Sequence, residues 1–184
     1  MARSADSPVA GVRLVVRWYL RLVRRHVGPG PYLDVGCGSG ELLRRLAAHG
    51  SASGYEPSAE TAAAVRSAAP GCPVHTGRDE VPSAVFRGVV AVHPSDGLDP
   101  AALAFWRRVL VPGDRALVVT AEAGARQALV DAGFTVVREG GVGRRAAGRL
   151  RALPAHLQTL SGRLVLKAGG DASVFVVQAP AAVE

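Results

Sequence analysis

The stretch "YLDVGCGSGELL", residues 32–43, changes from the apolar pattern of a buried strand to the pattern of a helix. Between the two lie Gly36, Gly38 and Gly40, at alternate positions. Glycine loses much conformational entropy on folding, so a run of glycines is favoured where the backbone needs positive φ or where another group must approach it closely. The stretch therefore predicts a tight strand–turn–helix unit with bare backbone at the turn, where a ligand can lie.

Strand and helix patterns alternate along the rest of the chain. Strands are expected at residues 32–35, 52–56, 73–76, 88–93, 115–120, 134–139 and 173–179. Helices are expected at residues 9–27, 41–49, 59–69, 100–110 and up to about 132, while residues 143–168 favour a helix at first and a strand later. This alternation predicts an α/β protein whose mainly parallel sheet is covered on both faces.

Local signals predict where several of these elements begin and end. Ser58 and Asp99 have the side chains that cap helix N-termini, and Pro100 suits a first helical position. Gly133 is expected to stop the helix before it. The stretch "VPGD" (111–114) is expected to turn the chain into the strand at 115–120.

The composition is that of a globular chain. Its 184 residues, 48% of them hydrophobic, suffice for one domain with a substantial core. No apolar run reaches the roughly 20 residues that cross a membrane, and the first residues lack a secretory signal pattern. The cysteines, Cys37 and Cys72, are expected to be reduced thiols, and no Cys/His cluster has metal-ligand spacing. These features predict a cytoplasmic protein.

The net charge of +7 is unevenly distributed. Residues 1–30 hold six Arg and one Asp, whereas residues 31–100 hold five Arg and eight acids. Residues 141–184 are basic again, with Arg144, Arg145, Arg149 and Arg151 close together. A solvated basic surface is the favoured interpretation, and binding of a polyanion or an anionic membrane surface by the basic ends remains open.

The spacing of the glycines distinguishes two kinds of ligand. A dinucleotide-binding turn reads G-x-G-x-x-G and needs glycine at position 41, where this chain has Glu41. An acidic side chain at the start of a helix is also expected to repel a pyrophosphate. Both facts favour the sulfonium compound S-adenosylmethionine (SAM) as the ligand.

Four stretches resemble the class I SAM-dependent methyltransferases. They are "YLDVGCGSGELL" (32–43), "GYEPS" (54–58), "AFWRRVLVPGDRALVVT" (104–120) and "DAGFTVVRE" (131–139). The resemblance spans roughly residues 30–140 and is most specific in the first two stretches. It implies a Rossmann-like three-layer sandwich with a mainly parallel sheet and an antiparallel C-terminal strand. It also implies one domain over 1–184, with a helical cap (1–30), a SAM-binding core (31–140) and a substrate-side segment with the last strand (141–184).

The resemblance assigns roles to individual residues. The glycines are expected to leave space that a Cβ would fill, and Asp34 to orient the turn or receive the ammonium of SAM through water. Glu56 is expected to bind both ribose hydroxyls with its two oxygens. Pro57 would pack on the adenine, and Asp79 would lie near the adenine amino group. The expected cofactor-binding residues are Asp34, Gly36, Cys37, Gly38, Gly40, Glu56, Pro57 and Asp79.

The loop "HPSDGLDP" (93–100) holds the candidate catalytic residues. Small-molecule methyltransferases often read E-H-L-x-D-P here, so their usual histidine is missing. His93 is the candidate general base, because its intrinsic pKa suits proton transfer, and capping of the strand is its alternative role. Asp96 is the second candidate and suits a turn equally well. Outside the loop, Arg87 replaces an aspartate that the family favours.

The sequence thus predicts a methyltransferase that moves the methyl group of SAM to an oxygen or nitrogen of a small molecule and releases S-adenosyl-L-homocysteine. The basic segments favour an acidic substrate, and specialised metabolism is the expected setting. Two alternatives remain: an RNA methyltransferase that uses the basic terminal segments, and a SAM-binding protein without methyltransferase activity. Nucleic acid is the less favoured partner, and the oligomeric state is not predicted.

Overall fold

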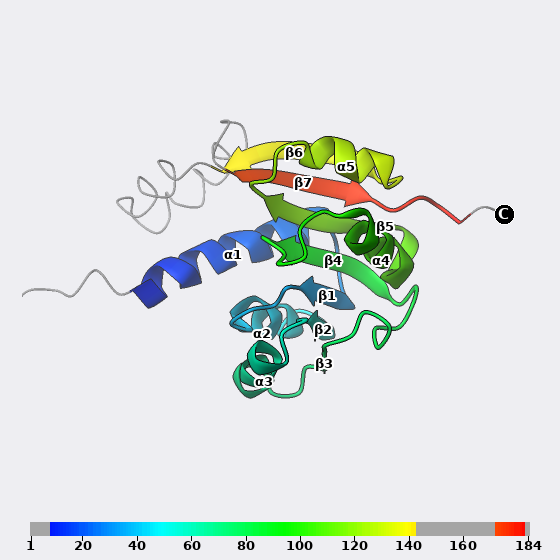
Figure 1. Cartoon of the computed structure of the whole chain (residues 1–184). Helices are drawn as coiled ribbons and strands as arrows, with labels where there is room; N and C mark the ends of the chain where they lie inside the picture. Colours follow the sequence, from blue (N-terminus) through cyan, green and yellow to red (C-terminus); the bar gives the residue numbers. More distant parts are fainter. Residues whose placement is uncertain (1–7, 143–171, 183–184) are drawn as a thin grey trace, which may run out of the picture.

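A seven-stranded sheet of order β3-β2-β1-β4-β5-β7-β6 forms the centre of the structure, a computed structural model that describes residues 8–142 and 172–182 (Figure 1). Strands β1 to β5 run parallel to one another, and β7 is antiparallel to both β5 and β6. The strands are β1 (Tyr32–Val35), β2 (Ala52–Tyr55), β3 (Val74–His75), β4 (Phe86–Val92), β5 (Leu110–Thr120), β6 (Thr135–Val142) and β7 (Ala172–Gln178). The expected mainly parallel sheet with an antiparallel C-terminal strand is confirmed.

Helices cover both faces of this sheet. One apolar cluster joins the sheet to α1 (Pro8–His26), α2 (Glu41–Ala47) and α3 (Ala59–Ala68). A second cluster joins the opposite face to α4 (Pro100–Val109) and α5 (Ala125–Asp131). The expected three-layer arrangement is therefore confirmed. Within the described ranges, no helix combines the length and the apolarity needed to span a bilayer.

The local signals of the sequence act as expected at three helix ends. Ser58 Oγ accepts a hydrogen bond from the Thr61 backbone N–H at 3.2 Å, which satisfies a free donor at the start of α3. Asp99 Oδ1 does the same for Ala102 in α4, at 2.6 Å, with Pro100 next to it at the first helical position. Gly133 follows α5 with φ +83°, as a helix stop requires.

The start of β5 differs from the prediction. The strand begins at Leu110, directly after α4, and includes the stretch 111–114 that was expected to be a turn. Leu110 pairs with Phe86, and the next pair is Arg115 with Gly88, so residues of β5 bulge out between the two pairs. Gly113 has φ +83° in this bulge. The turn residues therefore bend the strand without ending it.

The crossover from β3 to β4, residues 76–85, contains no helix. Arg108 of α4 holds it in place with three hydrogen bonds: to Val81 O at 2.9 Å, to Ser83 Oγ at 2.7 Å and to Arg78 O at 2.5 Å. The crossover is thus fixed by a side chain of α4 where other βαβ units use a helix.

Helix α1 has the expected two faces over the part whose side chains are described. Val16, Val23 and Val27 are buried, whereas Arg17 and Arg24 are exposed. Figure 1 shows the start of α1 on the side of the sheet where β4 and β5 end. The expectations for residues 143–168 lie outside the described residues, and the division into a cap, a core and a substrate-side segment stays a prediction.

Candidate functional site

The glycine turn joins β1 to α2 at the carboxyl edge of the sheet. Gly36, Gly38 and Gly40 have φ values of +68°, +49° and +72°, a region that side chains with a Cβ rarely adopt. The Gly36 backbone N–H donates to Tyr55 O at 2.8 Å, so the turn begins beside the end of β2. All three positions therefore need glycine for backbone conformation alone.

The space around each glycine is different. A Cβ at Gly36 would lie 3.4 Å from the Cα of Pro94, and one at Gly40 would lie 3.3 Å from Cγ1 of Val65. A Cβ at Gly38 would meet only the Gly36 carbonyl oxygen, at 3.8 Å. Gly36 and Gly40 thus let protein segments pack closely, and their contacts with a cofactor stay predictions. Gly38 alone faces open space.

Glu56 lies directly beside this open glycine. The residue is 6% exposed and follows β2. Its Oε2 accepts a hydrogen bond from the Gly38 backbone N–H at 3.2 Å, and its Oε1 accepts one from the Ser58 backbone N–H at 3.3 Å. Each carboxylate oxygen can accept a further hydrogen bond. The carboxylate is thus fixed in position and retains one acceptor site on each oxygen.

Asp34, in β1, is the most deeply buried acid of the site, at 2% exposed. Its Oδ2 has no hydrogen-bond partner among the described residues. Burial raises the pKa of Asp34 to about 8, the charge of Glu56 adds to this, and a hydrogen bond from the Leu43 backbone opposes it. The carboxyl group is therefore mainly protonated at neutral pH, and its free oxygen has unused hydrogen-bonding capacity.

Cys37 buries its side chain in the core. A Cβ at Gly54 would lie 2.8 Å from Cys37 Sγ, so the thiol fills the space that this glycine of β2 leaves. Burial raises the pKa of Cys37 to about 12, with smaller contributions from Asp34 and Glu56. The expected cofactor contact of Cys37 stays a prediction, and it would have to come from the backbone of this residue.

His93 follows β4 at the same edge. It has φ +49°, an uncommon conformation for a residue with a side chain, and its backbone N–H donates to Val119 O at 2.8 Å. The next residue, Pro94, packs beside Gly36. The exposed imidazole is thus presented from a strained backbone next to the glycine turn.

Asp96 is held in a network with two residues that the sequence analysis did not single out. Its Oδ2 accepts from Arg78 Nη2 at 2.8 Å and from the Tyr55 hydroxyl at 3.3 Å. The guanidinium of Arg78 also lies 5.8 Å from the ring centre of Phe105. Because Asp96 is ion-paired, the structure gives it the role of joining the loops after β3 and β4, and its expected role as a base gains no support.

Two predicted residues and one unpredicted acid complete the carboxyl edge. Pro57 and Asp79 are exposed, and their contacts with an adenine stay predictions. Glu122 follows β5, and its Oε2 accepts a hydrogen bond from the Leu98 backbone N–H at 3.3 Å. An acid two residues after a predicted parallel strand is the signal that would have identified Glu122, since ligands bind at this edge.

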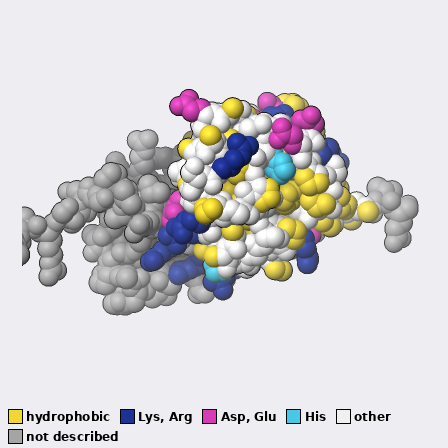
Figure 2. Space-filling view, turned by 90° about the horizontal axis from the view of Figure 1, so that it is seen from below, with side chains coloured by type: hydrophobic (Ala, Val, Ile, Leu, Met, Phe, Trp, Pro, Cys, Tyr) yellow, Lys and Arg dark blue, Asp and Glu magenta, His cyan; other side chains and the backbone are white. Residues whose placement is uncertain are grey.

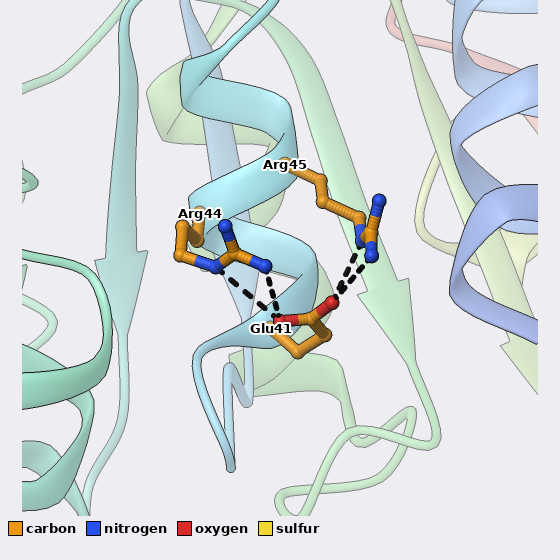
Figure 3. A network of polar contacts seen from close by, with 3 residues as sticks. All are labelled: Glu41, Arg44 and Arg45. Carbon is orange, nitrogen blue, oxygen red and sulfur yellow. Dashed lines mark hydrogen bonds and ion pairs between the residues drawn. The ribbon is translucent and has the colours of Figure 1, made fainter. Parts of the chain in front are cut away.

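Figure 3 shows Glu41, at the start of α2, between two guanidinium groups. Its carboxylate pairs with Arg44 at 2.8 Å and with Arg45 at 2.7 Å. These hydrogen bonds, led by that of Arg44, lower the pKa of Glu41. The arginines offset the charge of Glu41, so Glu41 should repel a pyrophosphate less than the sequence predicts. The missing glycine at position 41 remains the difference from a dinucleotide-binding turn.

Solved structures with the same fold cover nearly the whole chain. The N-methyltransferase NodS from Bradyrhizobium japonicum WM9 matches 94% of this chain and 98% of its own, with 12% identity and a TM-score of 0.66. A TehB-like SAM-dependent methyltransferase from Corynebacterium glutamicum matches 95% of this chain and 100% of its own, with 16% identity and a TM-score of 0.61. The cyclase SpnF matches 91% of this chain and 82% of its own, with 18% identity and a TM-score of 0.65.

These neighbours define the class of fold. NodS is also known in complex with S-adenosyl-L-homocysteine. No family model matches the chain, and no curated protein matches its sequence. The chain therefore has the fold of the class I SAM-dependent methyltransferases, at sequence identities that establish the fold and leave the activity to be argued from the site.

Proposed function

We propose that the chain is a SAM-dependent methyltransferase that acts on an oxygen or nitrogen of a small molecule. One observation carries the proposal: the buried carboxylate of Glu56 is fixed at 3.2 Å from the backbone nitrogen of Gly38, the one glycine of the turn that faces open space. A fixed carboxylate beside bare backbone suits a ligand with a vicinal diol and a chain that lies against the turn.

The residues of the site fit SAM. The remaining acceptor site on each oxygen of Glu56 suits the two ribose hydroxyls, and the open backbone at Gly38 suits the aminopropyl-carboxyl chain. The free Oδ2 of Asp34 is an acceptor for the ammonium group or a water bound to it. Pro57 and Asp79 would border the adenine. When bound, the cofactor supplies an electrophilic methyl group on its sulfonium sulfur.

His93 is the proposed general base for an acceptor that must lose a proton. Its exposed imidazole stands at the end of β4, beside the turn, and it makes no hydrogen bond to the described residues that would have to break first. Asp96 cannot serve in the same way while Arg78 binds it at 2.8 Å. Methyl transfer itself is a displacement, so the protein mainly aligns the acceptor and excludes water.

A SAM-binding protein with other chemistry is the second candidate. The ion pair of Asp96 removes one of the two expected bases, and the neighbour SpnF, a cyclase, shares the fold. The RNA methyltransferase is the third candidate, and the basic segments on which it rests lie partly outside the described residues. Figure 2 shows one face of the molecule, on which the basic side chains of the described residues lie in several separate groups.

Calorimetry with SAM and with S-adenosyl-L-homocysteine tests the cofactor site. Glu56→Ala should weaken SAM binding by about 1.5–3 kcal/mol, or about 10- to 150-fold, because hydrogen bonds to a charged group are lost. Glu60→Ala is the matched control, since Glu60 is an exposed acid four residues along the chain. Unchanged affinity in Glu56→Ala would remove Glu56 from the site.

The reaction class needs a second measurement. Formation of S-adenosyl-L-homocysteine that depends on an added small-molecule acceptor would support methyl transfer. Tight SAM binding together with no such product across amines, phenols and carboxylates would favour the second candidate. Binding of RNA that weakens steeply with salt, with methyl groups found on the RNA, would favour the RNA methyltransferase.

A further inference from the structure

A pocket of about 320 Å³ lies at the amino edge of the sheet, at the opposite end of the strands from the glycine turn. Its walls are the segment 25–29 after α1, Arg87 at the start of β4, the bulge 113–115 of β5 and Gln178 at the end of β7. None of these residues belongs to the proposed cofactor site. The pocket is therefore a separate feature of the molecule.

Hydrogen bonds between different elements fix the walls of this pocket. The Tyr32 hydroxyl donates to Gly28 O at 2.7 Å, and Arg115 Nη1 donates to His26 O at 3.1 Å. Gln178 Nε2 donates to Gly113 O at 2.8 Å. The end of α1, the bulge of β5 and the end of β7 are thus connected, and the pocket is formed in advance of any ligand.

The lining is strongly basic. Arg25, Arg87 and Arg115 line the pocket together with a single acid, Asp114. Arg87 forms an ion pair with this acid, with its Nε 3.2 Å from Asp114 Oδ2. Arg115 donates to a neutral carbonyl, and Arg25 has no carboxylate partner among the described residues. Two guanidinium groups therefore line one small pocket without a carboxylate partner among the described residues.

His26 lies near the same arginines. Its pKa is lowered first by burial and then by the charges of Arg138, Arg25 and Arg115. The described neighbours that act on His26 are thus all cationic, and they come from α1, β5 and β6. An anion in the pocket would relieve this repulsion.

We propose that the pocket binds the phosphate group of a small phosphorylated molecule. Guanidinium groups bind phosphate through paired N–H donors, and a phosphate has enough oxygens to accept from several arginines at once, whereas a carboxylate has only two. A volume of about 320 Å³ is at the lower end of the range for small-molecule pockets and suits a small ligand better than a nucleic-acid strand. The proposal does not depend on the proposed methyltransferase activity.

Inorganic pyrophosphate is the probe for this site. Calorimetry should show one binding site, and NMR of the histidine rings should show that the His26 signals shift while those of His93, at the opposite edge, do not. The anion should also raise the pKa of His26, because it offsets the nearby arginines. Shifts of His93 alone, or no binding at millimolar pyrophosphate, would overturn the proposal.

Two variants test the arginines. Arg25→Gln should weaken pyrophosphate binding about 5- to 10-fold, because one charge-assisted contact is lost from an exposed position. Arg87→Gln should weaken it more, since it also leaves Asp114 unpaired in the pocket. Arg126→Gln is the matched control, because Arg126 is an equally exposed arginine that pairs with Glu139 outside the pocket.

The outcomes separate this site from general attraction to a basic protein. Equal weakening in Arg126→Gln and Arg25→Gln would overturn the proposal. So would an oligonucleotide that displaces pyrophosphate and binds more tightly as its length increases, since the pocket would then be one contact of a nucleic-acid surface. Unchanged SAM affinity in all three variants would confirm that the two sites are distinct.

Discussion

The two edges of the sheet differ in the ionisable groups they hold and in how deeply these groups are buried. At the carboxyl edge, Asp34 and Glu56 are 2% and 6% exposed, and backbone N–H groups hold them. At the amino edge, arginines line an open pocket, and Arg115 donates to a backbone carbonyl. Burial makes a carboxylate costly unless a cation or donor reaches it, whereas a half-exposed guanidinium keeps much of its water.

This difference shows what each edge requires of a ligand. A ligand at the carboxyl edge has to satisfy buried acceptors, so it needs donors in fixed positions. A ligand at the amino edge has to bring negative charge, and its exact shape matters less. The two edges therefore predict opposite responses to pH, to substitution and to ligand charge.

The largest effect is expected from Asp34→Asn. The pKa of Asp34 is raised to about 8 from 3.8, so the folded state keeps a proton that the unfolded chain has lost. The stabilisation from this proton is complete below about pH 4 and is lost as the pH rises to about 8, by up to about 5 kcal/mol at 1.36 kcal/mol per pKa unit. Because Asn cannot ionise, the Asp34→Asn variant should not show this loss of stability at high pH.

Urea denaturation of both proteins at pH 5 and pH 8 measures this effect. The free energy of unfolding of Asp34→Asn, relative to that of the unsubstituted chain, should be higher at pH 8 than at pH 5. Glu60→Gln, which changes an exposed acid, should leave the pH dependence unchanged. Parallel pH profiles for the Asp34 variant and the parent would show that Asp34 ionises normally in the folded state.

A pair of glycines gives the next largest effect. Gly40, at the carboxyl edge, and Gly113, at the amino edge, both have positive φ, at +72° and +83°. A Cβ at Gly40 would crowd Val65 at 3.3 Å, whereas a Cβ at Gly113 would meet nothing within 4 Å. Gly40→Ala should therefore cost about 2–4 kcal/mol, from strain and overpacking, and Gly113→Ala about 1–2 kcal/mol, from strain alone.

The same denaturation measurement compares the two variants, each against the parent at one pH. Equal losses would show that the contact between the turn and α3 is not tight. A larger loss in Gly113→Ala would reverse the interpretation of the turn and would point to the bulge of β5 as the more constrained segment.

The parts of this site that the sequence predicted are those that local patterns specify. Ser58 and Asp99 cap helices within three residues of themselves, and Gly38 and Glu56 each follow a strand in a parallel sheet, so the topology brings them together. The order of strand, turn and helix was sufficient to place them. The strands of the sheet were predicted in the same way, but its irregularities were not.

The parts that the sequence did not predict depend on contacts between distant segments. Asp96 meets Arg78 only because the crossover 76–85 lies over α4, which Arg108 fixes. Cys37 points into the core because Gly54, in the next strand, leaves room for its sulfur. No spacing along the chain encodes either contact, since each depends on how two elements pack.

His93→Ala tests the carboxyl edge by a measurement of activity. With an acceptor that must lose a proton, its turnover should fall about 100-fold, the lower part of the range for general acid–base catalysis, while SAM affinity stays the same. His49→Ala is the control, since His49 is exposed after α2 and has no part in the proposed site. Initial rates of S-adenosyl-L-homocysteine formation measure both. Unchanged turnover in His93→Ala would leave His93 a residue that only ends the strand.

The smallest effect is expected at the amino edge, from His26→Gln, and its sign is opposite to that at Asp34. Burial and the charges of Arg138, Arg25 and Arg115 lower the pKa of His26. The unfolded chain therefore takes up a proton that the folded state resists, so the stabilisation is present above about pH 6.5 and is lost as the pH falls through that value. Because the imidazole is half-exposed, water reduces the effect well below that of Asp34.

Urea denaturation at pH 5 and pH 8 should show that His26→Gln gains stability at pH 5 relative to the parent, and that pyrophosphate, by neutralising the arginines, reduces this gain. A gain at pH 8 and none at pH 5 would show that the pKa of His26 is not lowered in the folded state.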